Sequence, residues 1–258
     1  MRFSKIRVAA LLTGLVLVSS LAGCKGNQEA STQYASPSFD NQTTEIPTMT
    51  DASTTDASLT DAIAEAASAN DAASAGDADQ LPASLSDALP MGTYSDDHRT
   101  YYNPLGNFKL SMAEDWQLMD ADSVASTTDA SVDEISNLWS GLKQPKDFET
   151  SFCAIANRQS TGSNIIISYL SPSAYLMPDL TAEKYLGMSV SRYENASVGT
   201  VKFLGQDYYF LDIPKNDSSV GRRVQLASDH DGLILIVTMT LQEDEELTDA
   251  FKLFDKIW

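Results

Sequence analysis

Residues 222–241 read RRVQLASDHDGLILIVTMTL, and this stretch decides the class of fold. Two runs rich in aliphatic residues, 222–228 and 233–241, flank the tetrapeptide Asp229-His230-Asp231-Gly232. Asp-Gly is a dipeptide that tight hairpin turns prefer, because both residues tolerate a positive φ. The stretch therefore predicts two neighbouring antiparallel strands.

Further strands are predicted on the N-terminal side of this hairpin. Residues 197–204 and 208–213 flank the turn residues Gly205-Gln206-Asp207, and Ile165-Ile166-Ile167 indicates a strand covered on both faces. Two more pairs of strands are predicted, at residues 148–157 with 163–170 and at residues 99–103 with 107–111. The sheet is thus expected to be mostly antiparallel.

Three helices are expected among these strands. Residues 132–142 are a short candidate, and residues 181–193 place apolar side chains on one face, with Thr181 positioned to cap. Residues 247–258 carry a broad apolar stripe that predicts a terminal helix. The order of elements predicts an α+β fold, an α-β-α sandwich in which helices cover the sheet.

Several short motifs resemble the PsbP-like and Mog1-like domains. Tyr102, then Phe108-Lys109-Leu110 and then Trp116 resemble the opening of such a domain, in which the tryptophan enters a helix. Residues 204–208, LGQDY, resemble the central hairpin, and the last predicted helix resembles the terminal one. The resemblance covers about 150 residues. It implies an α-β-α sandwich used mainly for binding or assembly, and it brings no catalytic residue.

The chain before Tyr94 differs in composition from the rest. Residues 24–93 are rich in Ser, Thr, Ala and Asp, and Thr-Asp-Ala recurs every five residues from Thr50. Such a segment cannot bury enough apolar surface to offset its conformational entropy, so a disordered acidic linker is expected. Residues 59–69 are alanine-rich and are expected to form at most a transient helix. A flexible chain of about 70 residues spans about 50 Å. The domain is then residues 94–258.

The N-terminus indicates export and lipid attachment. A basic start and an apolar run of about 14 residues precede Leu21-Ala22-Gly23-Cys24, so residues 1–23 are expected to be a signal peptide. The tetrapeptide resembles the lipobox of bacterial lipoproteins, in which the cysteine thiol takes a diacylglyceryl group. The alternative is an ordinary secretory signal with an accidental cysteine. The resemblance implies a protein held by lipid at Cys24 on the extracytoplasmic face of a bacterial membrane.

Charge narrows the choice of partners. The chain has 17 basic and 36 acidic residues, for a net charge of −19, and the expected signal peptide carries no acidic residue. Nucleic acid is therefore excluded as a partner, because phosphates need neutralisation by Lys and Arg. The expected partners are the membrane, through the lipid anchor, and an unidentified envelope protein or ligand.

Motifs for chemistry are absent from the sequence. It has no nucleophile elbow, P-loop, zinc-protease or dinucleotide motif, and only two histidines, so no catalytic residue and no cofactor are assigned. Asp229, His230 and Asp231 are weak candidates for a divalent cation, although Asp231-Gly232 also suits a turn. Cys153 lies among apolar residues and is interpreted as a small buried side chain, not a nucleophile.

Three functions are weighed. The preferred hypothesis is a non-catalytic binding or assembly domain, with an exposed apolar patch expected around Tyr169, Tyr175 and Tyr208. The alternatives are a cell-envelope hydrolase that acts through paired carboxylates and a surface protein that binds divalent cations.

Overall fold

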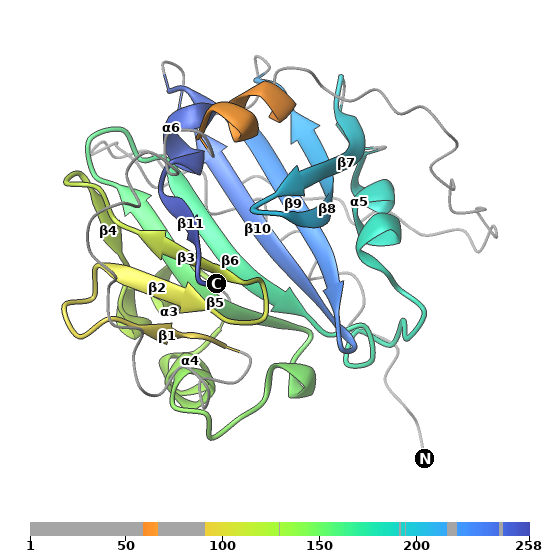
Figure 1. Cartoon of the computed structure of the whole chain (residues 1–258). Helices are drawn as coiled ribbons and strands as arrows, with labels where there is room; N and C mark the ends of the chain where they lie inside the picture. The colour runs from red at the N-terminus through yellow and green to blue at the C-terminus, as the bar shows by residue number, and fades with distance from the viewer. Residues whose placement is uncertain are drawn as a thin grey trace, which may run out of the picture.

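The computed structural model describes residues 59–66 and 91–258, apart from 129, 191, 194, 216–220 and 243–244. The expected signal peptide, the lipobox residues Leu21, Ala22, Gly23 and Cys24, and most of the expected linker lie outside these residues. The described chain forms two antiparallel sheets with helices packed around them (Figure 1).

The larger sheet has seven strands in the order β4-β5-β6-β10-β9-β8-β7, and every pairing in it is antiparallel. The strands are β4 (Trp116–Leu118), β5 (Thr150–Arg158), β6 (Asn164–Leu170), β7 (Ser197–Phe203), β8 (Gln206–Ile213), β9 (Arg222–His230) and β10 (Leu233–Leu241). The three central isoleucines of β6 are at most 4 % exposed, so this strand is covered on both faces as expected. The α+β class with a mostly antiparallel sheet is confirmed.

Two-residue turns close the β9–β10 and β7–β8 hairpins at the same end of the strands. His230 pairs with Leu233, and Asp231 and Gly232 between them have φ values of 43° and 82°. Leu204 and Gly205 take the same left-handed conformation between Phe203 and Gln206. The predicted Asp-Gly turn is confirmed, whereas the second turn lies one residue earlier than expected.

Helices cover one face of the larger sheet. The helix α5 (Ala182–Val190) packs on β8 and β9 through a cluster that contains Leu186, Leu211 and Ile236. The helices α3 (Ala121–Thr127) and α4 (Val132–Trp139) enclose Ile155 and Ile166 on the same face. Ser131 and Glu134 form a capping box at the start of α4, which explains why this helix begins there.

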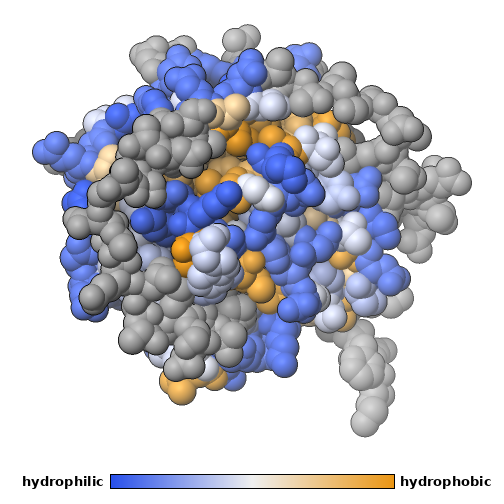
Figure 2. Space-filling model, viewed as in Figure 1, coloured by the Kyte–Doolittle hydropathy of each residue, from blue (hydrophilic) through white to orange (hydrophobic). Residues whose placement is uncertain are grey.

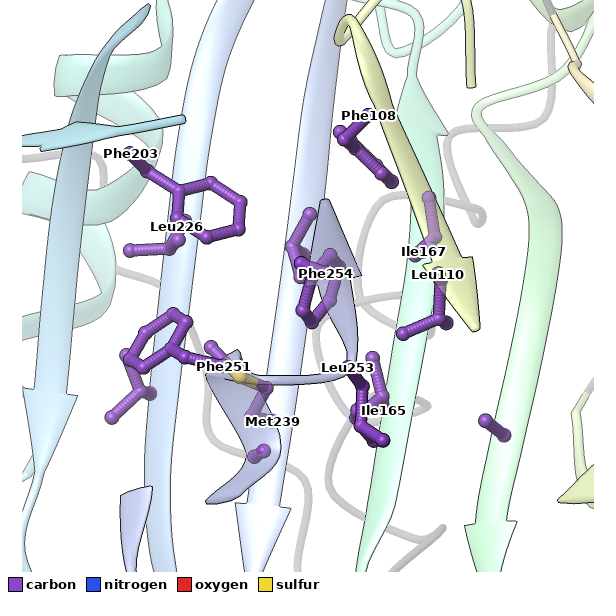
Figure 3. Close-up of a cluster of buried hydrophobic side chains, with 14 of the residues drawn as sticks. Phe108, Leu110, Ile165, Ile167, Phe203, Leu226, Met239, Phe251, Leu253 and Phe254 are labelled. Atoms are coloured by element: carbon purple, nitrogen blue, oxygen red, sulfur yellow. The ribbon is translucent and has the colours of Figure 1, made fainter. Parts of the chain in front are cut away.

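A second sheet covers part of the opposite face. It has the order β1-β2-β3-β11, with β1 (Thr93–Tyr94), β2 (Thr100–Asn103), β3 (Phe108–Ser111) and β11 (Phe254–Lys256). The expected α-β-α sandwich is therefore incomplete, because this face is covered by a sheet together with the short helix α6 (Leu247–Phe251). Figure 3 shows Phe203, Phe251 and Phe254 gathered over β9 and β10. The ring centroid of Phe203 lies 5.5 Å from that of Phe251 and 5.3 Å from that of Phe254.

The expected terminal helix over residues 247–258 is wrong after Phe251. Lys252 ends α6, and the following residues form β11, in which Phe254 pairs with Leu110 of β3. Phe254 is fully buried while Lys256 is exposed. The apolar residues after Phe251 therefore belong to a strand and not to the face of a helix. Pairing supplies the free edge of β3 with hydrogen-bond partners that a helix could not offer.

Trp116 also differs from expectation. It opens the edge strand β4, where it pairs with Arg158 of β5, and it does not enter a helix. The helix α3 begins five residues later, after Asp120, whose carboxylate accepts a hydrogen bond from the backbone N–H of Ser123 at 2.8 Å. The turn chemistry of Asp120, not the tryptophan, determines where this helix starts.

The folded unit extends further toward the N-terminus than the expected boundary at Tyr94. Residues 59–66, which we expected to belong to the linker, form a helix. Its side chains Leu59, Ala62, Ile63 and Ala66 are at most 8 % exposed and belong to the main core cluster. Figure 1 shows this helix in orange beside α6, above the ends of β9 and β10.

Candidate functional site

Asp229 and His230 are the last two residues of strand β9, and Asp231 lies in the turn that follows. Asp229 Oδ1 accepts a hydrogen bond from the backbone N–H of Ala182 at 2.9 Å, so it caps α5. Asp231 is exposed in the turn, and no group of three His, Cys, Asp or Glu side chains with metal-site geometry occurs in the part of the chain that the structure describes. The cation hypothesis thus finds no support at this turn.

His230 contacts the hydroxyl group of Ser228, a residue that the sequence analysis did not propose for the site. Its Nε2 lies 2.8 Å from Ser228 Oγ, and burial lowers the pKa of the imidazole while Asp229 and Asp231 partly oppose this effect. A serine beside a histidine is the start of a nucleophile–base arrangement, which needs a third group to orient the imidazole. Within the described residues no carboxylate is hydrogen-bonded to His230, and the pair therefore remains a contact between strand side chains.

Cys153 is buried between the two sheets, as its sequence context indicates. It is fully buried, and desolvation raises the pKa of its thiol far above the ordinary value. The polar groups nearby satisfy one another: Tyr169 Oη donates to Asn103 Oδ1 at 3.1 Å, and Asn103 Nδ2 donates to Tyr101 Oη at 3.1 Å. Burial and a raised thiol pKa both disfavour the thiolate, which is the nucleophilic form of cysteine.

The exposed apolar patch expected around three tyrosines is not formed, because two of the three are buried. Tyr169 and Tyr208 are at most 1 % exposed, because both point from the larger sheet into the core between the layers. Tyr175 alone is partly exposed. Sequence alone could not assign the two strand tyrosines to a face, since a shift of one residue in either strand would reverse their direction.

The most connected polar group joins three loops around Arg158. Arg158 Nε lies 2.5 Å from Asp115 Oδ2, and its Nη1 lies 3.0 Å from Glu245 Oε1. The hydroxyl groups of Thr161 and Ser163 donate to the carboxylate of Glu245, whose side chain is 7 % exposed. The guanidinium lies between the two carboxylates and neutralises both, which is not the arrangement of facing acid and base that a glycosidase needs.

A second buried carboxylate has the same kind of partner. Asp212 is 3 % exposed and accepts hydrogen bonds from Arg222 Nε at 3.0 Å and Nη2 at 2.5 Å. Such a bidentate pair fixes strand β9 against β8. The paired-carboxylate hypothesis stays a prediction without a supporting contact among the described residues.

A surface feature suited to recognition is the loop of residues 171–180, which we call the Leu176 loop. Leu176 is 81 % exposed and has a φ of 61°, a conformation that costs a leucine about 1 kcal/mol or more. Hydrogen bonds hold the loop in this form: the N–H groups of Tyr175, Leu176 and Met177 donate to the carbonyl groups of Ser171, Ser173 and Pro172.

The two residues beside Leu176 anchor the loop. Tyr175 and Met177 pack against the cluster under α5, and partial burial raises the pKa of the Tyr175 hydroxyl. The loop therefore presents one large apolar side chain from a rigid base. In the sequence, this loop is visible as the apolar triplet 175–177 between Pro172 and Pro178. Composition alone does not predict which of the three side chains is exposed.

Comparison with known proteins gives a structural likeness and no family assignment. No family model and no curated protein matches the chain. The chain is similar to the solved solution structure of cyanobacterial PsbP (CyanoP) from Synechocystis sp. PCC 6803, with 13 % identity and a TM-score of 0.34. The match covers 61 % of this chain and 91 % of that chain. Among the described helices, none has the length and apolar character to cross a membrane.

Proposed function

We propose that this protein is a lipoprotein, attached through Cys24 to the extracytoplasmic face of a bacterial membrane. The support is the order of a basic start, an apolar run and Leu21-Ala22-Gly23-Cys24. Two or more acyl chains on one residue hold a protein stably, whereas a single chain binds only reversibly. The acidic linker then sets the domain apart from the membrane surface.

The anchor is tested by comparing the two cysteines of the chain. The Cys24→Ala variant should lose incorporation of a labelled fatty acid and leave the membrane fraction, while Cys153→Ala should keep both properties. Fatty-acid labelling that persists in Cys24→Ala would overturn the proposal. Release of the unmodified wild-type chain into the medium would do the same and would favour an ordinary secretory signal.

We further propose that the domain is a non-catalytic binding or assembly module and that the Leu176 loop contacts its partner. The observation that carries this proposal is the exposed Leu176 held at a positive φ by a hydrogen-bonded loop. An apolar side chain presented from a rigid base loses little conformational entropy on binding, which is the property of a binding hot spot. Backbone strain of this kind tends to occur at functional sites.

Site-specific cross-linking tests the surface directly. A photoreactive amino acid placed at position 176 should give a cross-linked envelope protein in intact cells. The matched control is position 207, because the side chain of Asp207, near the β7–β8 turn, is 83 % exposed. Equal products at both positions, or none at 176, would contradict the proposed contact surface.

A further inference from the structure

One apolar region of the larger sheet is left uncovered by the second sheet. It lies on the face formed by β7 to β10, next to α6, where Phe203, Leu226 and Phe251 gather (Figure 3). The buried side chains of the helix at 59–66 belong to the same core cluster as Phe203, Leu226 and Phe251, and Figure 1 shows this helix beside α6. We call the region the helix groove. In Figure 2 hydrophobic residues gather on this part of the surface, where Figure 1 places α6 and the helix.

The helix lies in the groove with the pattern of a bound amphipathic peptide. Leu59, Ala62, Ile63 and Ala66 are buried, a spacing of i, i+3, i+4 and i+7, while Asp61 and Glu65 are exposed. This is how short helices from binding partners occupy apolar grooves. Here the helix belongs to the same chain, and residues 67–90 connect it to the domain.

Several features indicate that the helix is held weakly. The described part of the helix is eight residues long, and an isolated helix of that length is marginal in water. Two of its four anchoring side chains are alanines, which bury little surface. The hydroxyl group of Thr60 is also buried without a hydrogen-bond partner among the described residues, which opposes docking.

We propose that residues 59–66 occupy the helix groove reversibly, as a segment of the linker that docks in cis and can leave without unfolding the domain. When the helix is docked, only residues 25–58 separate Cys24 from the folded unit, a span of about 30 Å for a flexible chain. When it leaves, the whole linker is available and the span approaches about 50 Å. The change in reach rests on the proposed lipid anchor, whereas the docking itself does not.

A peptide competition experiment tests the docking without any lipid. The protein is the mature chain carrying Cys24→Ser, and the probe is a fluorescent synthetic peptide of residues 54–71. The tethered helix competes at an effective concentration on the order of mM, so the wild-type groove should be closed to the probe. The variant Ile63→Asp places a charge on the buried face of the helix, and it should bind the probe at least about tenfold more tightly. The matched control Glu65→Gln changes an exposed residue of the same helix and should behave as wild type.

Hydrogen exchange on the wild-type chain gives an independent measurement. Amides of residues 59–66 should exchange more slowly than those of the free peptide and much faster than those of β10. Exchange as fast as in the peptide would show that the helix is not docked. Exchange as slow as in β10 would show that the helix is a fixed part of the domain, and protection that rises with protein concentration would place a second copy's helix in the groove. Each of these three results, or equal probe binding by all variants, would overturn the proposal.

Discussion

The carboxylate of Asp229 accepts a hydrogen bond from the backbone N–H of Ala182 at 2.9 Å, so a strand residue caps a helix 47 positions away in the chain. Thr181 Oγ1 also accepts from the N–H of Lys184 at 3.3 Å. The first turn of α5 therefore has one local and one distant acceptor. The residue that we weighed as a cation ligand instead joins the β9–β10 hairpin to the helix that covers it.

The cap predicts a measurable loss of stability. Asp229→Ala removes an acceptor from the N-terminus of α5, and we expect it to lower the free energy of unfolding by about 1 kcal/mol. The matched control is Asp231→Asn, because asparagine tolerates the left-handed conformation that Asp231 adopts in the turn. Urea denaturation of both variants measures the difference. If the two variants lose the same stability, the hydrogen bond to Ala182 contributes nothing.

The same pair of variants separates the cap from a cation site. A ligand that binds only the folded state raises the melting temperature, and the rise grows with the ratio of ligand concentration to Kd. We expect millimolar Ca²⁺ to leave the melting temperature of the wild type unchanged relative to KCl of equal ionic strength. A calcium-dependent rise that Asp231→Asn abolishes would restore the cation hypothesis.

Because several tyrosine hydroxyl groups are buried, we expect the protein to lose stability at alkaline pH. Burial raises the pKa of Tyr185 and Tyr208 to about 12, and it raises the pKa values of Tyr94, Tyr101 and Tyr169 well above the ordinary value. In the unfolded chain these tyrosines ionise near pH 10, while in the folded chain they stay protonated. The unfolded state therefore binds fewer protons above pH 10, and stability falls as pH rises.

The size of this effect follows from the number of groups. Each tyrosine that stays protonated above its ordinary pKa lowers the free energy of unfolding by about 1.4 kcal/mol per pH unit. We expect the urea midpoint to fall steeply between pH 10 and 12, with little change between pH 7 and 9. Tyr101→Phe should make the fall less steep. A midpoint that is constant up to pH 12 would show that these hydroxyl groups reach water in the folded protein.

We expect that removing a buried carboxylate from an ion pair lowers the free energy of unfolding more than removing an exposed one. Glu245→Ala leaves Arg158 with Asp115 alone and removes the acceptor of two hydroxyl groups, so we expect a loss of about 2 kcal/mol. Asp249→Ala breaks an exposed pair with Lys252 and should cost less than about 0.5 kcal/mol. Thermal unfolding of both variants measures this. Equal losses would mean that the Arg158 network is as solvated as the surface pair.

The sequence was most informative where period-2 patterns and turn residues agreed. The stretch from Arg222 to Leu241 predicted two strands and their turn, because alternation, the Asp-Gly dipeptide and strand length all indicated one hairpin. Thr181 likewise predicted the start of α5. The lipobox and lipid attachment assigned to Leu21, Ala22, Gly23 and Cys24 stay predictions, since those residues lie outside the described chain.

Prediction failed where contacts between distant residues decide the conformation. Residues 247–258 carry a stripe that suits a helix, yet Phe254 pairs with β3, an edge that no local pattern reveals. Residues 59–66 have too few apolar side chains to fold alone, and they become helical on a surface made by residues far along the chain. The exposure of Leu176 depends in the same way on the packing of its neighbours.

The strained leucine gives a last prediction, which connects stability with binding. Leu176→Asn should leave the fold intact and raise the free energy of unfolding by up to about 1 kcal/mol, because asparagine adopts a positive φ at lower cost and the leucine side chain buries little surface. Its matched control is Leu142→Asn, which removes an equally exposed leucine, 76 % exposed. Urea denaturation measures stability, and recovery of the cross-linked partner with the photoreactive residue at position 173, an exposed position of the same loop, measures binding. We expect Leu176→Asn to gain stability and lose the partner, while Leu142→Asn changes neither. A Leu176→Asn variant that is more stable and still binds would show that the loop conformation is not maintained for recognition, and the proposed contact surface would then have to lie elsewhere on the domain.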